Sequence, residues 1–235
     1  MRESEPGEKP DRSRGGLYGR RKGKTLRPHQ TQLLHELLPR LSLDLTHRIS
    51  DAGAPFGSAV CEVWLEIGFG GGEHLIEAAR TNPNTGIIGC EPFVNGVAKA
   101  LAAIESHGLT NIRLHTGDAA DILRWLPEAA LRRVFLLFPD PWPKRRQHKR
   151  RFISAENLRA LARVMRRGAE LRFATDIDDY AGWTLARVLR SSDFVWLPER
   201  SADWNTPWPG WHETRYEAKA RTGGRRPVYL TFIRR

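Results

Sequence analysis

The chain has 235 residues, 40% of them hydrophobic, so it can bury one sizeable core and predicts a single α/β domain. Its 38 Lys and Arg exceed its 27 Asp and Glu. The formal net charge of +11 favours a polyanionic partner, above all nucleic acid, with generic surface charge as the alternative. The polar N-terminus and the lack of an apolar run of membrane length argue against a membrane protein and predict a cytoplasmic one.

The chain has two cysteines, Cys61 and Cys90, which fit neither a C-x-x-C motif nor a zinc-ligand set. Reduced thiols are therefore favoured over a disulfide, in keeping with a cytoplasmic protein. The histidines His74, His148 and His212 are scattered along the sequence, so we expect no metal site.

The first residues, 1–30, are rich in charge, Gly and Pro and predict a disordered basic arm. A solvated tail without a role is the alternative. Residues 31–49 carry a helical stripe of leucines, interrupted by Pro39, which is expected to cap the core. Residues 31–235 are expected to form one domain.

From residue 63 onward, strand patterns alternate with helix patterns. Strands are expected at residues 63–67, 86–91, 112–116, 134–138, 171–175, 194–197 and 228–233. Helices are expected at residues 72–81, at 95–106 with Gly108 as C-cap, from an N-cap at Ser154 to Gly168, and at 178–191. This alternation predicts a seven-stranded, mostly parallel sheet with helices on both faces.

The segment Trp64–Leu75 has the pattern E-x-G-x-G-x-G, filled by Glu66, Gly68, Gly70 and Gly72. Glycines let a strand turn tightly into a helix whose free N–H groups face a ligand. A dinucleotide fingerprint would need glycine at position 73, which is Glu73. The acid two residues before the first glycine suits a cationic ligand without phosphate, such as S-adenosylmethionine. A purely structural turn is the alternative.

Acids stand at five consecutive expected strand ends, where ligands of such sheets bind. They are Glu66, Glu91, Asp118, Asp140 and Asp176. Glu91 is expected to accept from ribose hydroxyls and Asp118 from an adenine amino group. Glu66 is expected near the positive charges of the methionine end. Any single acid of this set could instead be a helix N-cap.

The segment Phe138–Arg151, FPDPWPKRRQHKRR, places Asp140 in a loop stiffened by prolines. Six of its last eight residues are basic: Lys144, Arg145, Arg146, Lys149, Arg150 and Arg151. We expect these six side chains to contact nucleic-acid phosphates while the carboxylate recognises the base. A solvated basic loop and a nuclear-localisation-like run are the alternatives.

This segment, together with LEIGFGGGEHL, ATDIDDY and HETRYEAKA, resembles the signatures of the bacterial tRNA (guanine-N7-)-methyltransferases of the TrmB type, over residues 60–235. The resemblance implies a Rossmann-like class I S-adenosylmethionine-dependent methyltransferase fold. It also implies S-adenosyl-L-methionine as methyl donor, S-adenosyl-L-homocysteine as product, and the variable-loop guanine of tRNA as target. The partner is then tRNA, and the protein is a monomer or a homodimer.

Carried over by residue, the resemblance implies cofactor contacts at Glu66, Glu91, Asp118 and Asp140, beside the glycine-loop contacts expected at Gly68 and Gly70. It implies substrate contacts at Lys144, Asp176, Thr214, Arg215, Tyr216 and Glu217, with Asp140 as the catalytic residue. The family often has T-K-F-E where this chain has T-R-Y-E. The arm before residue 30 matches only loosely.

Residues 198–220 are expected to form a lid, with three tryptophans, Trp204, Trp208 and Trp211. They either stack on a base that has left its helix or fasten the lid to the core. Guanine N7 has a lone pair and no proton, so no general base is expected. Asp140 is expected to accept from guanine N1–H and the N2 amino group, which excludes adenine, and Asp176 could share this recognition. Methylation of another RNA, base atom or protein, a non-catalytic tRNA-binding protein and, last, an NAD-dependent oxidoreductase are the alternatives.

Overall fold

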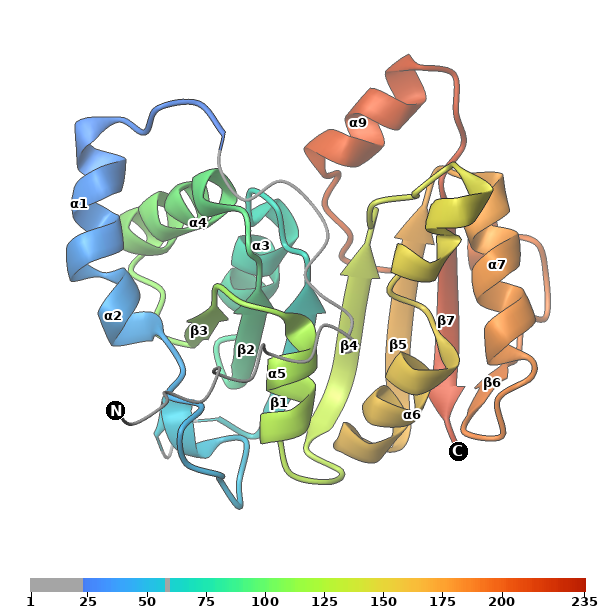
Figure 1. Ribbon diagram of the computed structural model, residues 1–235, viewed down its shortest axis with the longest axis horizontal. Coiled ribbons are helices and arrows are strands. Elements are labelled where there is room, and N and C mark those ends of the chain that lie inside the picture. Colours follow the sequence, from blue (N-terminus) through green and yellow to red (C-terminus); the bar gives the residue numbers. More distant parts are fainter. Residues whose placement is uncertain (1–22, 58–59) are drawn as a thin grey trace, which may run out of the picture.

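In a computed structural model that describes residues 23–57 and 60–235, seven strands form one sheet in the order β3-β2-β1-β4-β5-β7-β6 (Figure 1). The strands are β1 Glu62–Ile67, β2 Thr85–Cys90, β3 Ile112–His115, β4 Leu131–Leu137, β5 Met165–Thr175, β6 Phe194–Trp196 and β7 Val228–Arg234. Strands β1 to β5 pair in parallel, and β7 runs antiparallel to both β5 and β6. The predicted seven-stranded, mostly parallel sheet is confirmed.

Helices cover both faces of this sheet (Figure 1). They are α1 Pro28–Glu36, α2 Leu38–Leu41, α3 Glu73–Thr81, α4 Val94–His107, α5 Ala119–Trp125, α6 Ala155–Val164, α7 Asp178–Val188, α8 Ala202–Asn205 and α9 Arg215–Thr222, with 3₁₀ turns η1 Ala54–Phe56 and η2 Arg145–Arg150. Helices α1 to α4 pack on one face, and α5 to α7 pack on the other. Within the described ranges, no helix combines the length and apolarity needed to cross a bilayer.

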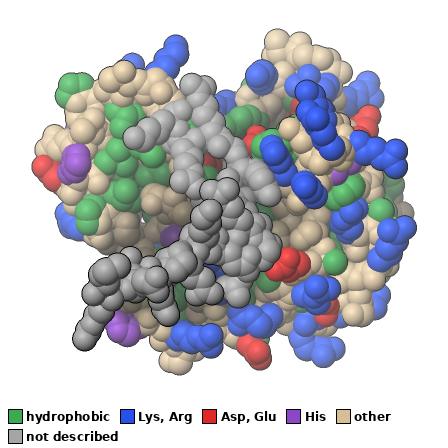
Figure 2. Space-filling model, viewed as in Figure 1, with side chains coloured by type: hydrophobic (Ala, Val, Ile, Leu, Met, Phe, Trp, Pro, Cys, Tyr) green, Lys and Arg blue, Asp and Glu red, His purple; other side chains and the backbone are tan. Residues whose placement is uncertain are grey.

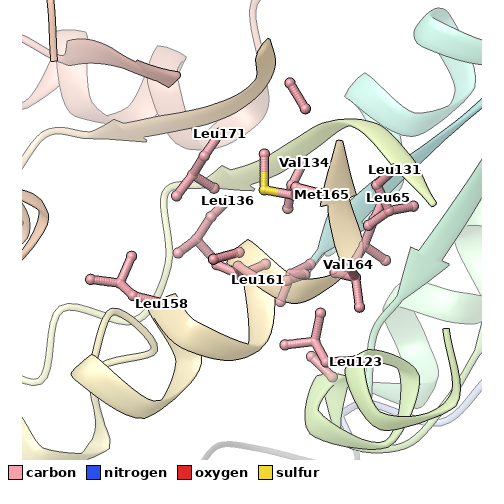
Figure 3. Packing of buried hydrophobic residues seen from close by; sticks show 14 of the residues in the cluster. Leu65, Leu123, Leu131, Val134, Leu136, Leu158, Leu161, Val164, Met165 and Leu171 are labelled. Carbon is pink, nitrogen blue, oxygen red and sulfur yellow. The ribbon is translucent and has the colours of Figure 1, made fainter. Parts of the chain in front are cut away.

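The two cores follow from the alternation of side chains along the strands. In β1, Leu65 faces the core under α5 and α6, whereas Trp64 faces the core under α3 and α4. Figure 3 shows Leu65 and Val134 of the strands packed near Leu161 of α6. Each fully buried aliphatic side chain contributes roughly 1.5–3 kcal/mol, so these layers fix the strands whose ends carry the site.

The helix expected to run from Ser154 to Gly168 is shorter in the structure. Its start is confirmed, because Ser154 Oγ accepts from the Asn157 amide at 3.1 Å. Its expected end is wrong: α6 stops at Val164 and β5 begins at Met165, which pairs with Leu131 of β4. A register shift in β4 accommodates the extra residues, and Gly168 supplies a positive φ of 76° inside the strand rather than a helix cap.

The N-terminal arm was expected to be disordered to residue 30, and this is wrong for its last residues. Helix α1 begins at Pro28, and Asn95 of α4 accepts from the Gly23 amide and donates to the Lys24 carbonyl, both at 2.6 Å. Residues 1–22 lie outside the described residues. The leucine stripe does cap the sheet, and Pro39 lies at the start of α2, where a missing N–H is tolerated.

Candidate active site

The glycine loop between β1 and α3 turns through three left-handed residues. Gly68, Gly70 and Gly72 have φ angles of 75°, 56° and 84°. A residue with a Cβ atom adopts such backbone angles only with strain. A Cβ on Gly72 would also lie 2.9 Å from Cβ of Ala100 in α4. The loop therefore needs glycine for its backbone path, and at Gly72 for close packing as well.

Glu91 follows β2 and ties the glycine loop to the start of α4. Its Oε2 accepts from the Gly70 amide at 2.7 Å and its Oε1 from the Phe93 amide at 2.8 Å. Burial raises the pKa of the Glu91 carboxyl, the two amide bonds lower it, and the charges of Asp140 and Glu66 raise it again. Each oxygen has a further lone pair, so the carboxylate can also accept from a ligand hydroxyl.

Glu66 is the last residue but one of β1 and is buried beside His74 in the first turn of α3. Its Oε2 lies 2.7 Å from His74 Nδ1. The His74 ring packs 4.4 Å from the ring of Phe135 and 5.4 Å from that of Trp211, measured between centroids. Sequence reasoning considered His74 only as a metal ligand and missed this pairing. Its position in the first turn of the helix after the glycine loop is the signal that could have found it.

Asp118 follows β3 and caps α5, since its Oδ1 accepts from the Ala120 amide at 2.9 Å. The helix-cap alternative considered for any single acid of the set therefore holds for Asp118. Because β3 lies next to β2, Asp118 and Glu91 follow neighbouring strands of the sheet.

The five acids predicted at strand ends stand on five adjacent strands. In spatial order they are Asp118, Glu91, Glu66, Asp140 and Asp176. Among the described residues, no Lys or Arg forms an ion pair with the first four, although Glu66 contacts His74. The same residues contain no group of three or more His, Cys, Asp or Glu arranged to hold a metal ion. Carboxylates without Lys or Arg partners provide an environment in which a positive charge is favourable.

Asp140 stands in a strained loop after β4. Phe138 and Trp142, on either side of Pro139–Pro141, have φ angles of 49° and 45°, and such residues cost on the order of 1–3 kcal/mol each. Solvent reaches the Asp140 side chain, yet the surrounding protein excludes enough water to raise the pKa of its carboxyl. The loop holds one carboxylate in a fixed place at the open edge of the sheet.

The basic run divides into an outer and an inner part. Lys144, Arg145, Arg146 and Lys149 are exposed. Lys and Arg side chains gather at the upper right of Figure 2, over the region of η2 and α9. Arg150 is half-buried, with its guanidinium 4.9 Å from the centroid of the Trp142 ring. Arg151 is buried, so the prediction that Arg151 contacts nucleic-acid phosphates is wrong.

Asp176 follows β5, and its Oδ2 accepts from Arg225 Nε at 2.5 Å. Arg225 comes after α9 in the chain, so this ion pair links the end of β5 to the segment that covers the site. Unlike the four other strand-end acids, Asp176 therefore already has a guanidinium partner among the described residues.

The four residues Thr214–Glu217 do two different things in the structure. Thr214 caps α9 by accepting from the Glu217 amide at 3.2 Å. Glu217 is buried and accepts from Trp211 Nε1, the Tyr229 hydroxyl and Arg221. These contacts fasten α9 to the domain. A direct contact of either residue with substrate stays a prediction.

Arg215 and Tyr216 lie instead over the glycine loop. Arg215 Nε is 3.4 Å from Glu73 Oε1, and the Tyr216 ring is 3.1 Å from where a Cβ on Gly70 would stand. The Tyr216 side chain is exposed, with 43% of its surface accessible to solvent. In Figure 1, α9 lies above the edge toward which the arrowheads of β4 and β5 point. The segment thus covers the predicted cofactor loop.

The three tryptophans of the expected lid fasten it to the domain. Trp208 Nε1 donates to Thr231 Oγ1 at 2.7 Å, and Trp208 and Trp211 both pack edge-on against Tyr229. Trp204 packs against Trp196 of β6 with 5.8 Å between centroids. These contacts support the alternative in which the tryptophans fasten the segment to the core. Stacking of an indole on a base stays a prediction.

The sequence profile of a family described as a putative methyltransferase matches residues 61–230. Solved structures share the fold. A 16S rRNA methyltransferase, KamB, is 19% identical with a TM-score of 0.54, covering 81% of this chain and 96% of its own. A 16S rRNA (adenine(1408)-N(1))-methyltransferase from Catenulisporales acidiphilia with cosubstrate SAM is 14% identical with a TM-score of 0.52, covering 82% and 91%. Sheet order, glycine loop and acids define a Rossmann-like class I methyltransferase fold.

The sequence relatives narrow the assignment from the fold to one family. A tRNA (guanine-N(7)-)-methyltransferase from Nitrobacter hamburgensis is 54% identical over 221 residues, which cover 94% of this chain and 87% of the relative. Proteins with the same name from Bradyrhizobium diazoefficiens and Brucella melitensis are each 52% identical, and each comparison covers 96% of this chain and 97% of the relative. The chain belongs to the tRNA (guanine-N(7)-)-methyltransferase family.

Proposed function

We infer that this protein transfers a methyl group from S-adenosylmethionine to N7 of a guanine in tRNA. The observation that carries the inference is 54% identity over 94% of the chain with a protein of that activity. The acids at the open edge of the sheet and the exposed basic run beside Asp140 support it, because they suit a cationic methyl donor and a polyanionic substrate. The resemblance to the bacterial enzymes supports the variable-loop guanine as the target and the cytoplasm as the place of action.

The residues present fit S-adenosylmethionine. When bound, it supplies an electrophilic methyl group on a positively charged sulfur. Glu66, Glu91 and Asp140 offer negative charge without Lys or Arg partners among the described residues, and their like charges help to keep the pKa of Glu91 raised. A cation in their midst relieves this repulsion. Glu91 would hold the ribose hydroxyls and Asp118 the adenine amino group, with Gly68 and Gly70 letting the backbone approach.

The chemistry asks little of the protein beyond alignment and charge. The N7 lone pair forms the new bond to the methyl carbon while the carbon–sulfur bond breaks and its electron pair stays on sulfur. No proton leaves N7, so no general base is needed. Asp140 orients the base by accepting from N1–H and the N2 amino group, and its charge offsets the positive charge that develops on guanine. Asp176 shares this task if the guanine displaces or joins Arg225.

The test is to incubate the protein with unmodified tRNA and labelled S-adenosylmethionine and to map the modified nucleotide by mass spectrometry. We expect one labelled 7-methylguanosine, in the variable loop. A methyl group at N1 or N2 would contradict the mechanism without a base. Label in another RNA only would change the substrate, and the absence of any transfer would favour a non-catalytic tRNA-binding protein.

A further inference from the structure

Arg151 is the last residue of the basic run, and its side chain points into the protein. Its side chain has no measurable exposure, although five basic residues precede it within seven positions. A buried guanidinium is costly unless its donors are satisfied and its charge is paired. The contacts that compensate Arg151 therefore show what its burial achieves.

Those contacts join the loop after β4 to the first turn of α7, which follows β5. Arg151 Nε donates to the carbonyl of Pro141 at 2.8 Å, immediately after Asp140. Its terminal nitrogens donate to the carboxylate and the carbonyl of Asp179, in the first turn of α7 and three residues after Asp176. One side chain thus bridges the loop that carries Asp140 and the first turn of α7, which follows directly after Asp176 and Ile177.

Aromatic rings fix the guanidinium between these two segments. It lies 4.7 Å from the centroid of the Tyr180 ring and 5.1 Å from that of Trp183, both on α7. The Tyr180 hydroxyl accepts from the Phe152 amide at 3.1 Å, and burial raises the pKa of Tyr180 to about 12. The hydrogen bond from Arg151 lowers the pKa of Asp179, so the Asp179 carboxyl is ionised at neutral pH.

We propose that Arg151 is a positioning residue that sets the distance and angle between Asp140 and Asp176, the two carboxylates that recognise the guanine. This inference rests on the proposed function. The backbone supports it independently, because Phe138 and Trp142 hold unfavourable left-handed conformations on either side of Asp140. A loop strained in this way keeps its shape only where other contacts over-determine it, and the bond to the Pro141 carbonyl is such a contact.

Arginine is required here because one planar fork serves two acceptors at once. A lysine at this position keeps the positive charge but offers a single ammonium, which cannot hold the Pro141 carbonyl and the Asp179 carboxylate together in the same directions. Arg151→Lys therefore separates the effect of the bridge from the effect of the charge. We expect the substitution to loosen the loop and misplace Asp140 while leaving the outer basic side chains in place.

The matched control is Arg187→Gln. Arg187 stacks on the same Trp183 ring, 3.1 Å from its centroid, but contacts neither Pro141 nor Asp179. Three quantities are measured on the full-length variants: the single-turnover methylation rate at saturating S-adenosylmethionine and tRNA, the Kd of each, and hydrogen exchange of the amides in residues 138–144. The last of these needs no activity.

For Arg151→Lys we expect a rate loss on the order of 10²-fold, little change in either Kd, and faster exchange in residues 138–144, because small misplacements of aligned groups are costly. Arg187→Gln should match the wild type in all three. If Arg151→Lys does not fold, Asp179→Ala takes its place, with a smaller rate loss and faster exchange in the same residues.

A normal rate in Arg151→Lys, or in the folded Asp179→Ala that replaces it, overturns the proposal. So does a slow variant whose amides in residues 138–144 exchange as in the wild type, and so does an equal rate loss in Arg187→Gln. A wild type that methylates no guanine would instead refute the proposed function, and the exchange measurement would still report whether Arg151 fixes the loop.

Discussion

The two sides of the sheet's open edge hold their acids by different means. On the side of β1, β2 and β3, Glu91 and Asp118 accept from backbone amides, and neither has a basic partner among the described residues. On the side of β4 and β5, arginines hold the loops: Arg225 pairs with Asp176, and Arg151 bridges the Asp140 loop to α7. The first side keeps negative charge available to a cation, whereas the second fixes the positions of its carboxylates.

Because of this difference, substitutions on the two sides should impair different steps. Loss of an acid beside the glycine loop should weaken the cofactor complex, because the acid contributes charge and hydrogen-bond acceptors to binding. Loss of an acid or a bridge beside β4 should slow the reaction, because alignment counts mainly in the transition state. Separate measurements of affinity and single-turnover rate can break or sharpen this division.

The largest effect is expected for Asp140→Asn, which keeps the shape of the side chain and removes its charge. Loss of one preorganised electrostatic contact costs on the order of 10²–10³ in rate, so single-turnover methylation with both substrates saturating should fall by that amount. Cofactor affinity, measured by calorimetry, should fall much less. A wild-type rate would remove Asp140 from the catalytic assignment, and a loss confined to cofactor affinity would place it on the other side of the comparison.

A smaller effect is expected for Glu91→Ala, and it should appear in cofactor affinity rather than in the methylation rate. The substitution removes a charged acceptor worth about 1.5–3 kcal/mol, so cofactor affinity should weaken roughly 10- to 100-fold. The rate at saturating cofactor should change less, although the Gly70 and Phe93 amides lose their acceptor. Glu105→Ala is the matched control. Glu105 lies on α4 and forms an exposed ion pair with His29 of α1, so this variant should bind the cofactor normally. Unchanged calorimetry for Glu91→Ala would refute the assignment.

Much of the fold and of the glycine side of the site could be predicted from the sequence, because local patterns determine them. Apolar runs predicted the strands, Gly68–Gly72 predicted the turn, and an acid at the end of each of the first five strands marked the edge where ligands bind. The start of β5 could not be predicted, because Arg166–Gly168 resemble a helix end, and only the pairing of Met165 with Leu131 of β4 places the start of the strand before them.

The other side of the site depends on tertiary contacts that composition does not encode. Nothing in the letters KRRQHKRR distinguishes the arginine that turns inward from those that face solvent; the contact with Asp179, 28 positions away, does. The same holds for Trp208 and Trp211, whose partners on β7 and α9 show that they fasten the segment. Sequence reasoning placed these residues at the site but could not assign what they contact.

The smallest effect is expected on the outer basic run, where no single side chain is held in place. Replacing Arg145 and Lys149 by Gln removes two exposed positive charges beside Asp140. If both contact tRNA phosphates, affinity should fall and the dependence of log affinity on log salt should flatten by roughly one unit per lost contact. Cofactor affinity and the saturated rate should hardly change, because neither charge lies in the acid cluster.

The control for this pair is Arg166→Gln with Arg167→Gln, which removes the same charge from exposed positions at the start of β5, at the opposite end of that strand from Asp176. If charge at any position attracts tRNA equally, the two double variants will show the same loss, and the basic run is then only a solvated surface. If phosphates are held beside the site, the salt dependence changes for Arg145 and Lys149 alone. That outcome would show that the side of the edge whose loops are fixed by arginines is also the side from which the tRNA approaches.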